Sequence, residues 1–173
     1  MTDTFLPADY KEPAGKYLKL TVGEHNIRIM SSAIVGYEFW TNENKPVRSK
    51  NAFKSTPNIK KDTGVKFFWA FIIYNYDADA IQICEITQKS IQASIKNLIN
   101  NKKWGDVSGY DLTITRIGEG FDTEYSTVPN PSTVLPQSVI DRFNEMKINL
   151  NALYEGNDPF SDNQPEATVE PKF

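Results

Sequence analysis

Cysteine and histidine are almost missing from this chain of 173 residues, which holds one of each, Cys84 and His25. A lone cysteine cannot close an intramolecular disulfide, so a disulfide-stabilised secreted domain is excluded. Structural zinc sites use a set of Cys and His ligands that the chain cannot supply. Cys84 lies within an apolar run and His25 in a predicted turn, so neither is typical of a catalytic nucleophile or base. We expect no catalytic residue, no metal site and no cofactor.

Long apolar runs are also missing. No stretch approaches the roughly 18 apolar residues of a membrane-spanning helix. The first residues, Met-Thr-Asp-Thr-Phe-Leu-Pro, lack the basic and apolar regions of a signal peptide. A Gly-rich phosphate-binding loop is absent too, since Gly118-Glu119-Gly120 is typical of a hairpin turn. These absences predict a cytoplasmic protein that is not an enzyme.

The net charge is small, but the charges are unevenly distributed. The formal net charge is −3, yet residues 10–150 hold 18 Lys and Arg against 15 Asp and Glu. Residues 151–173 hold five acids against one Lys. So polar a segment cannot bury enough apolar surface to offset its ordering entropy, and we expect it to be mobile. The sequence predicts a flexible arm at 1–15, one domain at 16–154 and an acidic mobile tail at 155–173.

Apolar residues that recur with a period of two predict a mainly β domain. The expected strands are 17–22, 27–30, 34–41, 67–76, 81–86, 110–117 and 121–128. Between the fifth and sixth of these, apolar residues at helical spacing predict a helix over 87–101, and a last helix is expected over 137–154. Strands, one helix and further strands follow one another as in a five-stranded OB-type barrel, here with an added C-terminal helix.

In the middle of the chain, a polar segment at 42–66 that is rich in basic residues lies between two strands that are rich in aromatic residues. Proteins that bind single-stranded nucleic acid combine a cationic groove for the phosphates with aromatic faces on which bases stack. The expected phosphate contacts are Lys45, Arg48, Lys50, Lys54, Lys60, Lys61, Lys66, Lys102 and Lys103. The expected stacking residues are Trp40, Phe68, Tyr74, Tyr76 and Trp104. Arg48 is the strongest single candidate, because a guanidinium can bind a phosphate with two N–H groups and also stack.

Several segments carry a resemblance to a known family. They include Lys45-Pro46-Val47-Arg48-Ser49, Phe68-Trp69-Ala70, Ile81-Gln82-Ile83-Cys84-Glu85-Ile86, Trp104-Gly105-Asp106 and Tyr110-Asp111-Leu112-Thr113-Ile114. Over about residues 14–160 the chain resembles bacteriophage single-stranded DNA-binding proteins with an OB-fold. The resemblance implies binding of exposed DNA strands without sequence preference during replication, recombination or repair, in the cytoplasm of a bacterial host. It also implies an acidic C-terminal segment that contacts replisome proteins, for which the candidate residues are Asp158, Phe160 and Phe173.

Other functions remain open at this point. Asp106, Asp111 and Glu124 could hold Mg²⁺ in a nuclease. The aromatic residues could instead form a subunit interface in a phage structural or protein-interaction module. An RNA chaperone of the cold-shock type would use the same barrel and the same chemistry.

Overall fold

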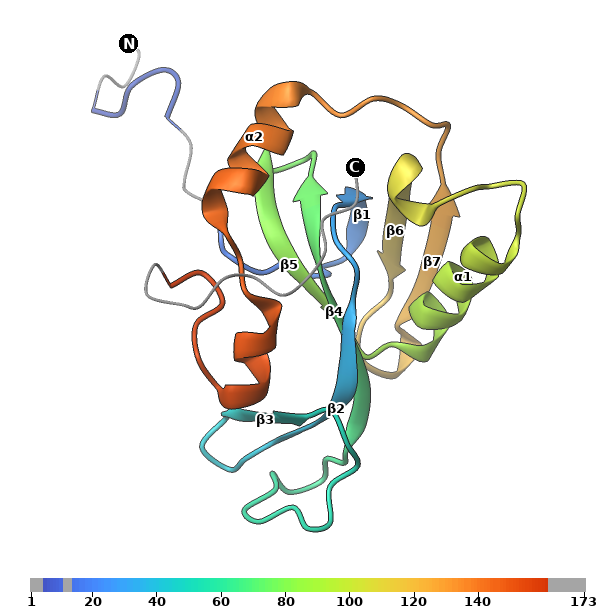
Figure 1. Ribbon diagram of the computed structural model, residues 1–173. Helices are drawn as coiled ribbons and strands as arrows, with labels where there is room; N and C mark the ends of the chain where they lie inside the picture. Colours follow the sequence, from blue (N-terminus) through green and yellow to red (C-terminus); the bar gives the residue numbers. More distant parts are fainter. Residues whose placement is uncertain (1–4, 11–13, 162–173) are drawn as a thin grey trace.

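The computed structural model describes residues 5–10 and 14–161, which form one antiparallel sheet with helices packed on both faces (Figure 1). The strands are β1 (Gly23–Ile29), β2 (Ile34–Trp40), β3 (Pro46–Ser49), β4 (Lys66–Asn75), β5 (Ala80–Ile86), β6 (Asp111–Ile117) and β7 (Glu124–Pro129). The helices are α1 (Lys89–Asn100) and α2 (Gln137–Met146), with short 3-10 helices η1 (Val107–Gly109), η2 (Gly120–Asp122) and η3 (Leu150–Glu155). The mainly β class is confirmed. None of the described helices combines the length and the apolar character needed to cross a bilayer.

The long strand β4 organises the sheet. The strand order is β3-β2-β4-β1-β6-β7, and β5 pairs with the other edge of β4. β2 and β1 lie end to end along one edge of β4, and at their junction the Met30 N–H donates to the Ile72 carbonyl at 2.8 Å. Over the described strands the sheet is open, so the closed barrel expected from the sequence is not observed.

Both faces of β4 are buried, which explains its continuous apolar sequence. On one face, Phe71 and Ile73 pack with the apolar side of α1. On the other, Phe68 and Ile72 pack with residues of α2 and η3. Both faces of this strand are therefore covered along most of its length. The exception is the end nearest Lys66, where the strand is exposed.

The N-terminal part of the domain differs from its prediction. Residues 17–22 alternate like a strand, but only Tyr17 forms an isolated bridge, to Ile83 of β5. The Leu18 N–H donates to the Ile83 carbonyl at 2.9 Å, and the Ile83 N–H donates to the Lys16 carbonyl at 3.0 Å. Residues 16–18 therefore run along the outer edge of β5. Leu18 and Leu20 pack against the core on the α1 side, which accounts for the apolar alternation without a strand.

The C-terminal helix is shorter than predicted. α2 ends at Met146 because Lys147 takes a left-handed backbone conformation with φ of 46°. The chain then continues through the buried residue Ile148 into η3, where Leu150 and Leu153 are also buried against the sheet. Breaking the helix lets these residues follow the face of β4 that α2 alone would leave open.

Candidate nucleic-acid interface

A groove of about 850 Å³ lies between the exposed start of β4, the first turn of α1 and the tip of the β6–β7 hairpin. Its walls include three aromatic rings and three cations and no Asp or Glu. These residues are Tyr37, Phe67, Tyr125, Lys66, Lys89 and Arg116, and we call the site they form the basic groove.

The aromatic wall of the basic groove comes from cross-strand pairing. Phe67 on β4 lies opposite Tyr37 on β2, with ring centroids 5.5 Å apart and an interplanar angle of 64°. Phe67 is on the same face of β4 as the buried Phe71, because side chains on a strand alternate. It nevertheless keeps 42% of its surface exposed. The groove therefore presents an apolar ring that a second flat ring could cover.

The position of α1 fixes the opposite wall. The Gln92 side chain is buried, and its Nε2 donates to the carbonyl of Phe67 at 3.2 Å and to that of Ile86 at 3.0 Å. These bonds connect the first turns of α1 to β4 and β5. As a result the N-terminal end of the helix, with Lys89, is held beside the Phe67 ring.

The cations of the basic groove carry uncompensated charge. Lys66 and Lys89 are exposed, and neither forms an ion pair with any residue that the structure describes. Arg116 donates from Nη1 to the carbonyl of Leu20 at 3.0 Å, a neutral partner that leaves its charge in place. Three cations without a carboxylate among them produce a positive local potential that attracts polyanions.

Of the cations predicted from the sequence, only Lys66 lines the basic groove. Lys50 lies with its ammonium 5.4 Å from the centre of the Tyr154 ring, and Lys60 donates to Asn44 Oδ1 at 2.8 Å. Lys45 lines a different cavity, and Lys54 and Lys61 are exposed on the loop. Lys102, Lys103 and Trp104 lie together in the turn that follows α1.

Arg48 does not occupy the role predicted for it. Its side chain is 8% exposed and lies between two carboxylates, with Nε 3.2 Å from Glu38 Oε2 and Nη2 2.7 Å from Glu85 Oε2. Its guanidinium carbon is also 5.8 Å from the centre of the Phe68 ring. Because its hydrogen-bonding groups are used inside the protein, the structure does not support Arg48 as a phosphate contact.

One of the two carboxyl groups around Arg48, that of Glu38, has a raised pKa. Burial is the main reason that the pKa of Glu38 is raised to about 8, and the hydrogen bond and negative charge of Glu85 add to it against the attraction of Arg48. The raised pKa favours the protonated form of Glu38 in the folded protein, and Arg48 lies close enough to balance the charge of Glu85. A second cavity, of about 640 Å³, borders this cluster and includes Trp40.

The predicted stacking residues divide into two groups. Trp40 and Trp104 are 41% and 42% exposed, so each has a face available. Phe68 and Tyr74 are buried, and the prediction that they stack on bases is wrong because no ligand can reach their faces. Tyr76 is half-buried, its ring is 4.8 Å from that of Tyr74, and its hydroxyl donates to Asp111 at 2.7 Å, which leaves it a structural residue.

The first residues of the expected mobile tail are packed on the domain. Asp158 lies 3.4 Å from the Lys16 ammonium, and the Phe160 ring meets the Tyr17 ring edge-on at 6.2 Å between centroids. The Pro159 carbonyl accepts the Asn149 N–H at 3.0 Å. Asp158 and Phe160 are therefore parts of the packed body, whereas Phe173 lies outside the described residues.

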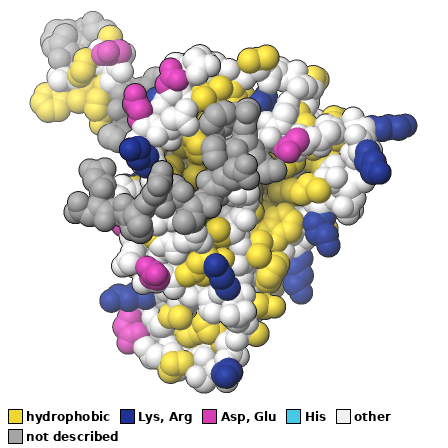
Figure 2. Space-filling view, in the orientation of Figure 1, with side chains coloured by type: hydrophobic (Ala, Val, Ile, Leu, Met, Phe, Trp, Pro, Cys, Tyr) yellow, Lys and Arg dark blue, Asp and Glu magenta, His cyan; other side chains and the backbone are white. Residues whose placement is uncertain are grey.

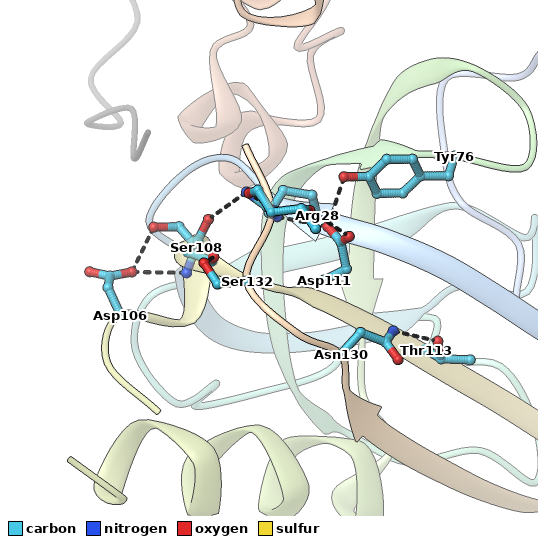
Figure 3. Close-up of polar contacts among 10 residues, drawn as sticks. Arg28, Tyr76, Asp106, Ser108, Asp111, Thr113, Asn130 and Ser132 are labelled. Atoms are coloured by element: carbon cyan, nitrogen blue, oxygen red, sulfur yellow. Dashed lines mark hydrogen bonds and ion pairs between the residues drawn. The ribbon is translucent and has the colours of Figure 1, made fainter. Parts of the chain in front are cut away.

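Two of the three acidic residues considered for a magnesium site, Asp106 and Asp111, bond to other parts of the fold (Figure 3), and the third, Glu124, is exposed on β7. Asp111 Oδ1 accepts a hydrogen bond from Arg28 Nε at 2.8 Å in addition to that from Tyr76. Asp106 Oδ1 accepts from the N–H and the hydroxyl of Ser108 at 2.9 and 2.7 Å and so caps η1. Over residues 5–10 and 14–161, no group of three or more His, Cys, Asp or Glu is arranged to hold a metal ion.

The sequence prediction included Lys66 but missed the five other residues of the basic groove, namely Tyr37, Phe67, Lys89, Arg116 and Tyr125. One signal could have found part of them. Residues 86–105 contain four Lys and no Asp or Glu, which marks the α1 region as the more strongly basic one.

Comparisons with known proteins give no relative from which a function could be transferred. A scan against protein-family models, a search of curated proteins and a search of solved structures each found no match to this chain. The function is therefore inferred from the geometry of the described residues.

Proposed function

We propose that this protein binds single-stranded DNA without sequence preference through the basic groove, and that it acts in phage DNA replication, recombination or repair. One observation carries the proposal: the groove combines three cations with three aromatic rings and has no carboxylate in its walls. Ammonium and guanidinium groups attract the phosphates, and exposed rings stack on bases, which contributes about 1 to 3 kcal/mol per base. Every base offers such a face, so the binding is tolerant of sequence.

The order of the elements supports an OB-type assignment. β1 with β2, then β4, β5, α1, β6 and β7 follow the OB order, and OB barrels are partly open. In OB folds, ligands contact the loops between the first and second strands and between the fourth and fifth. The basic groove is bounded by the corresponding parts of this chain, Val65 at the end of the β2–β4 connection and Gly120 in the β6–β7 hairpin.

The decisive test is the Phe67→Ala variant. Loss of the exposed ring is expected to weaken binding of a fluorescently labelled oligo-dT by about 5- to 150-fold, because one stacking contact is removed. Fluorescence anisotropy with oligo-dT, a mixed-sequence strand, oligo-U and duplex DNA measures both the affinity and the class of ligand. Phe5→Ala removes another exposed phenylalanine, in the N-terminal arm, and serves as the matched control.

Two results would contradict the proposal. One is equal affinity of the wild type for duplex and single strands. The other is an unchanged affinity of Phe67→Ala for oligo-dT while the variant remains folded. Tighter binding of oligo-U than of oligo-dT would transfer the function to RNA.

We assign recruitment of replication or recombination proteins to the segment after Ser161, since Asp158 and Phe160 are packed on the body. This segment holds three acids against one Lys, so it also competes weakly with DNA for the basic groove. Ending the chain after Ser161 is expected to tighten oligo-dT binding by about two- to fivefold at low salt, with little effect at high salt where the attraction is screened. Thermal unfolding should be unchanged. Weaker DNA binding, or full retention of a replication partner in a pull-down, would refute the assignment.

A further inference from the structure

One side of α1 extends the basic groove. Lys89, Gln92, Lys96 and Ile99 are spaced at i, i+3, i+7 and i+10, so they form one stripe along the helix. The first two line the basic groove. Lys96 is exposed, and Ile99 keeps 53% of its surface exposed although it is apolar. The stripe therefore leads from the groove toward the C-terminal end of α1 with both charge and apolar surface.

The charge of this region has one sign. Lys102 and Lys103 follow Lys89 and Lys96 in a segment, residues 86–105, that contains no Asp or Glu. None of these four lysines forms an ion pair with a residue in the described part of the chain. In Figure 2, Lys and Arg side chains follow the side of the molecule where α1 and the next turn lie. An ordinary solvated helix face usually mixes both signs, and this one does not.

Trp104 stands at the end of the stripe as a fixed exposed ring. The backbone N–H of Trp104 donates to the Asn101 carbonyl at 3.0 Å, and Gly105 follows with a φ of +74° that turns the chain away. The ring is 42% exposed and packs with its centroid 5.5 Å from that of the buried Tyr110. Packing on a core residue holds the indole in place, which lowers the entropic cost of stacking a base on its free face.

We infer that the bound strand continues from the basic groove along α1 and stacks a further base on Trp104. This inference rests on the proposed function and adds the path that the bound strand takes and the length of strand that is bound. The 12 residues of α1 span about 18 Å at about 1.5 Å per residue. At about 3.4 Å per stacked nucleotide this distance corresponds to about five nucleotides beyond the groove. Full affinity therefore requires a strand long enough to reach both ends.

The test compares a short oligo-dT of about 4 nucleotides with a long one of about 12. The short strand fills the basic groove alone, so the wild type is expected to bind it more weakly. Trp104→Ala is expected to weaken binding of the long strand by about 5- to 150-fold and to leave the short strand unchanged. Phe67→Ala should weaken both. Trp40→Ala, which removes an equally exposed tryptophan at the second cavity, should leave the ratio of the two affinities unchanged.

A second variant covers the case in which Trp104→Ala does not fold. Lys96→Gln combined with Lys103→Gln keeps the Trp104 ring and is expected to lower the salt dependence for the long strand by about 1.4 in logarithmic slope, but not that for the short strand. The inference is overturned if either variant weakens binding of the short and the long strand equally, or weakens binding of neither strand. It is also overturned if Trp104→Ala changes the oligomeric state instead. If Phe67→Ala still weakens both lengths in that case, the proposed function survives. If the wild type binds neither strand, both proposals fail.

Discussion

Replacing Arg48 by Met is expected to lower the free energy of unfolding by about 3 to 5 kcal/mol at about pH 9, because a buried ion pair that loses one partner leaves an unpaired charge. Glu38 and Glu85 would then face each other in a site with little access to water. Methionine fills similar volume and places a thioether where the guanidinium lies beside the Phe68 ring. Urea denaturation of the wild type and the variant measures the change. At about pH 6 the difference should be smaller, since the raised pKa of Glu38 lets it take up a proton, so fewer negative charges are left without a partner.

Glu38→Gln is the matched control for this cluster. The folded protein holds the Glu38 proton up to a pKa of about 8, whereas the unfolded chain releases it near the ordinary glutamate pKa of 4.5. Between these values the folded state binds more protons, so this group makes the wild type less stable as the pH rises, by at most about 1.4 kcal/mol per pH unit. Glu38→Gln cannot titrate, and its stability should exceed that of the wild type at about pH 9.

A pH-independent loss of stability in Arg48→Met would contradict the ion-pair assignment. A normal stability combined with lost DNA binding would restore Arg48 as a phosphate contact.

Removing two lysines from the basic groove is expected to have a large effect on DNA affinity and on its salt dependence. Each phosphate contact contributes about 0.7 to the logarithmic salt slope of a single strand. Lys66→Ala together with Lys89→Ala should therefore lower the slope by about 1.4 and the affinity for oligo-dT by nearly two orders of magnitude at about 50 mM salt. The loss should be similar for strands of any sequence, because phosphates are common to all of them.

The loop lysines provide a control with the same change of charge. Lys54→Ala together with Lys61→Ala removes two exposed cations that do not line the basic groove. This pair is expected to change the affinity only a few-fold, through the general field of the protein. A larger effect of the loop pair than of the groove pair would show that the original sequence prediction for residues 45–66 was the better one.

The elements with a strong local pattern could be predicted from the sequence. The β4–β5 hairpin, α1 and the β6–β7 hairpin lie close to their expected ranges, because each combines a clear apolar period with turn residues at its end. The segment 17–22 has the same alternation but only one bridge partner, so its pattern reflects packing without strand pairing. Whether β5 and β7 meet across the opening of the sheet depends on distant parts of the chain, which a local pattern cannot reveal.

The site was harder to predict than the fold. Phe67 and Phe68 are neighbours with the same chemistry, but Phe68 is buried with residues of α2 and η3, whereas Phe67, on the opposite face, stays partly exposed. Arg48 has a basic neighbourhood in the sequence, but its partner Glu85 is 37 positions away. Lys89 and Arg116 belong to different elements that come together only in the folded protein. The type of site was inferred from composition, whereas its members were set by tertiary contacts.

The short segment that lies along β5 has a consequence for behaviour at high concentration. Strand edges with free N–H and C=O groups can recruit a strand from a neighbouring molecule and start aggregation. Here the carbonyl and N–H of Ile83 are already bonded to Leu18 and Lys16 of the same chain. The middle of the β5 edge is therefore already paired within the molecule, which makes it a poorer template for a strand of a neighbouring molecule at high protein concentration.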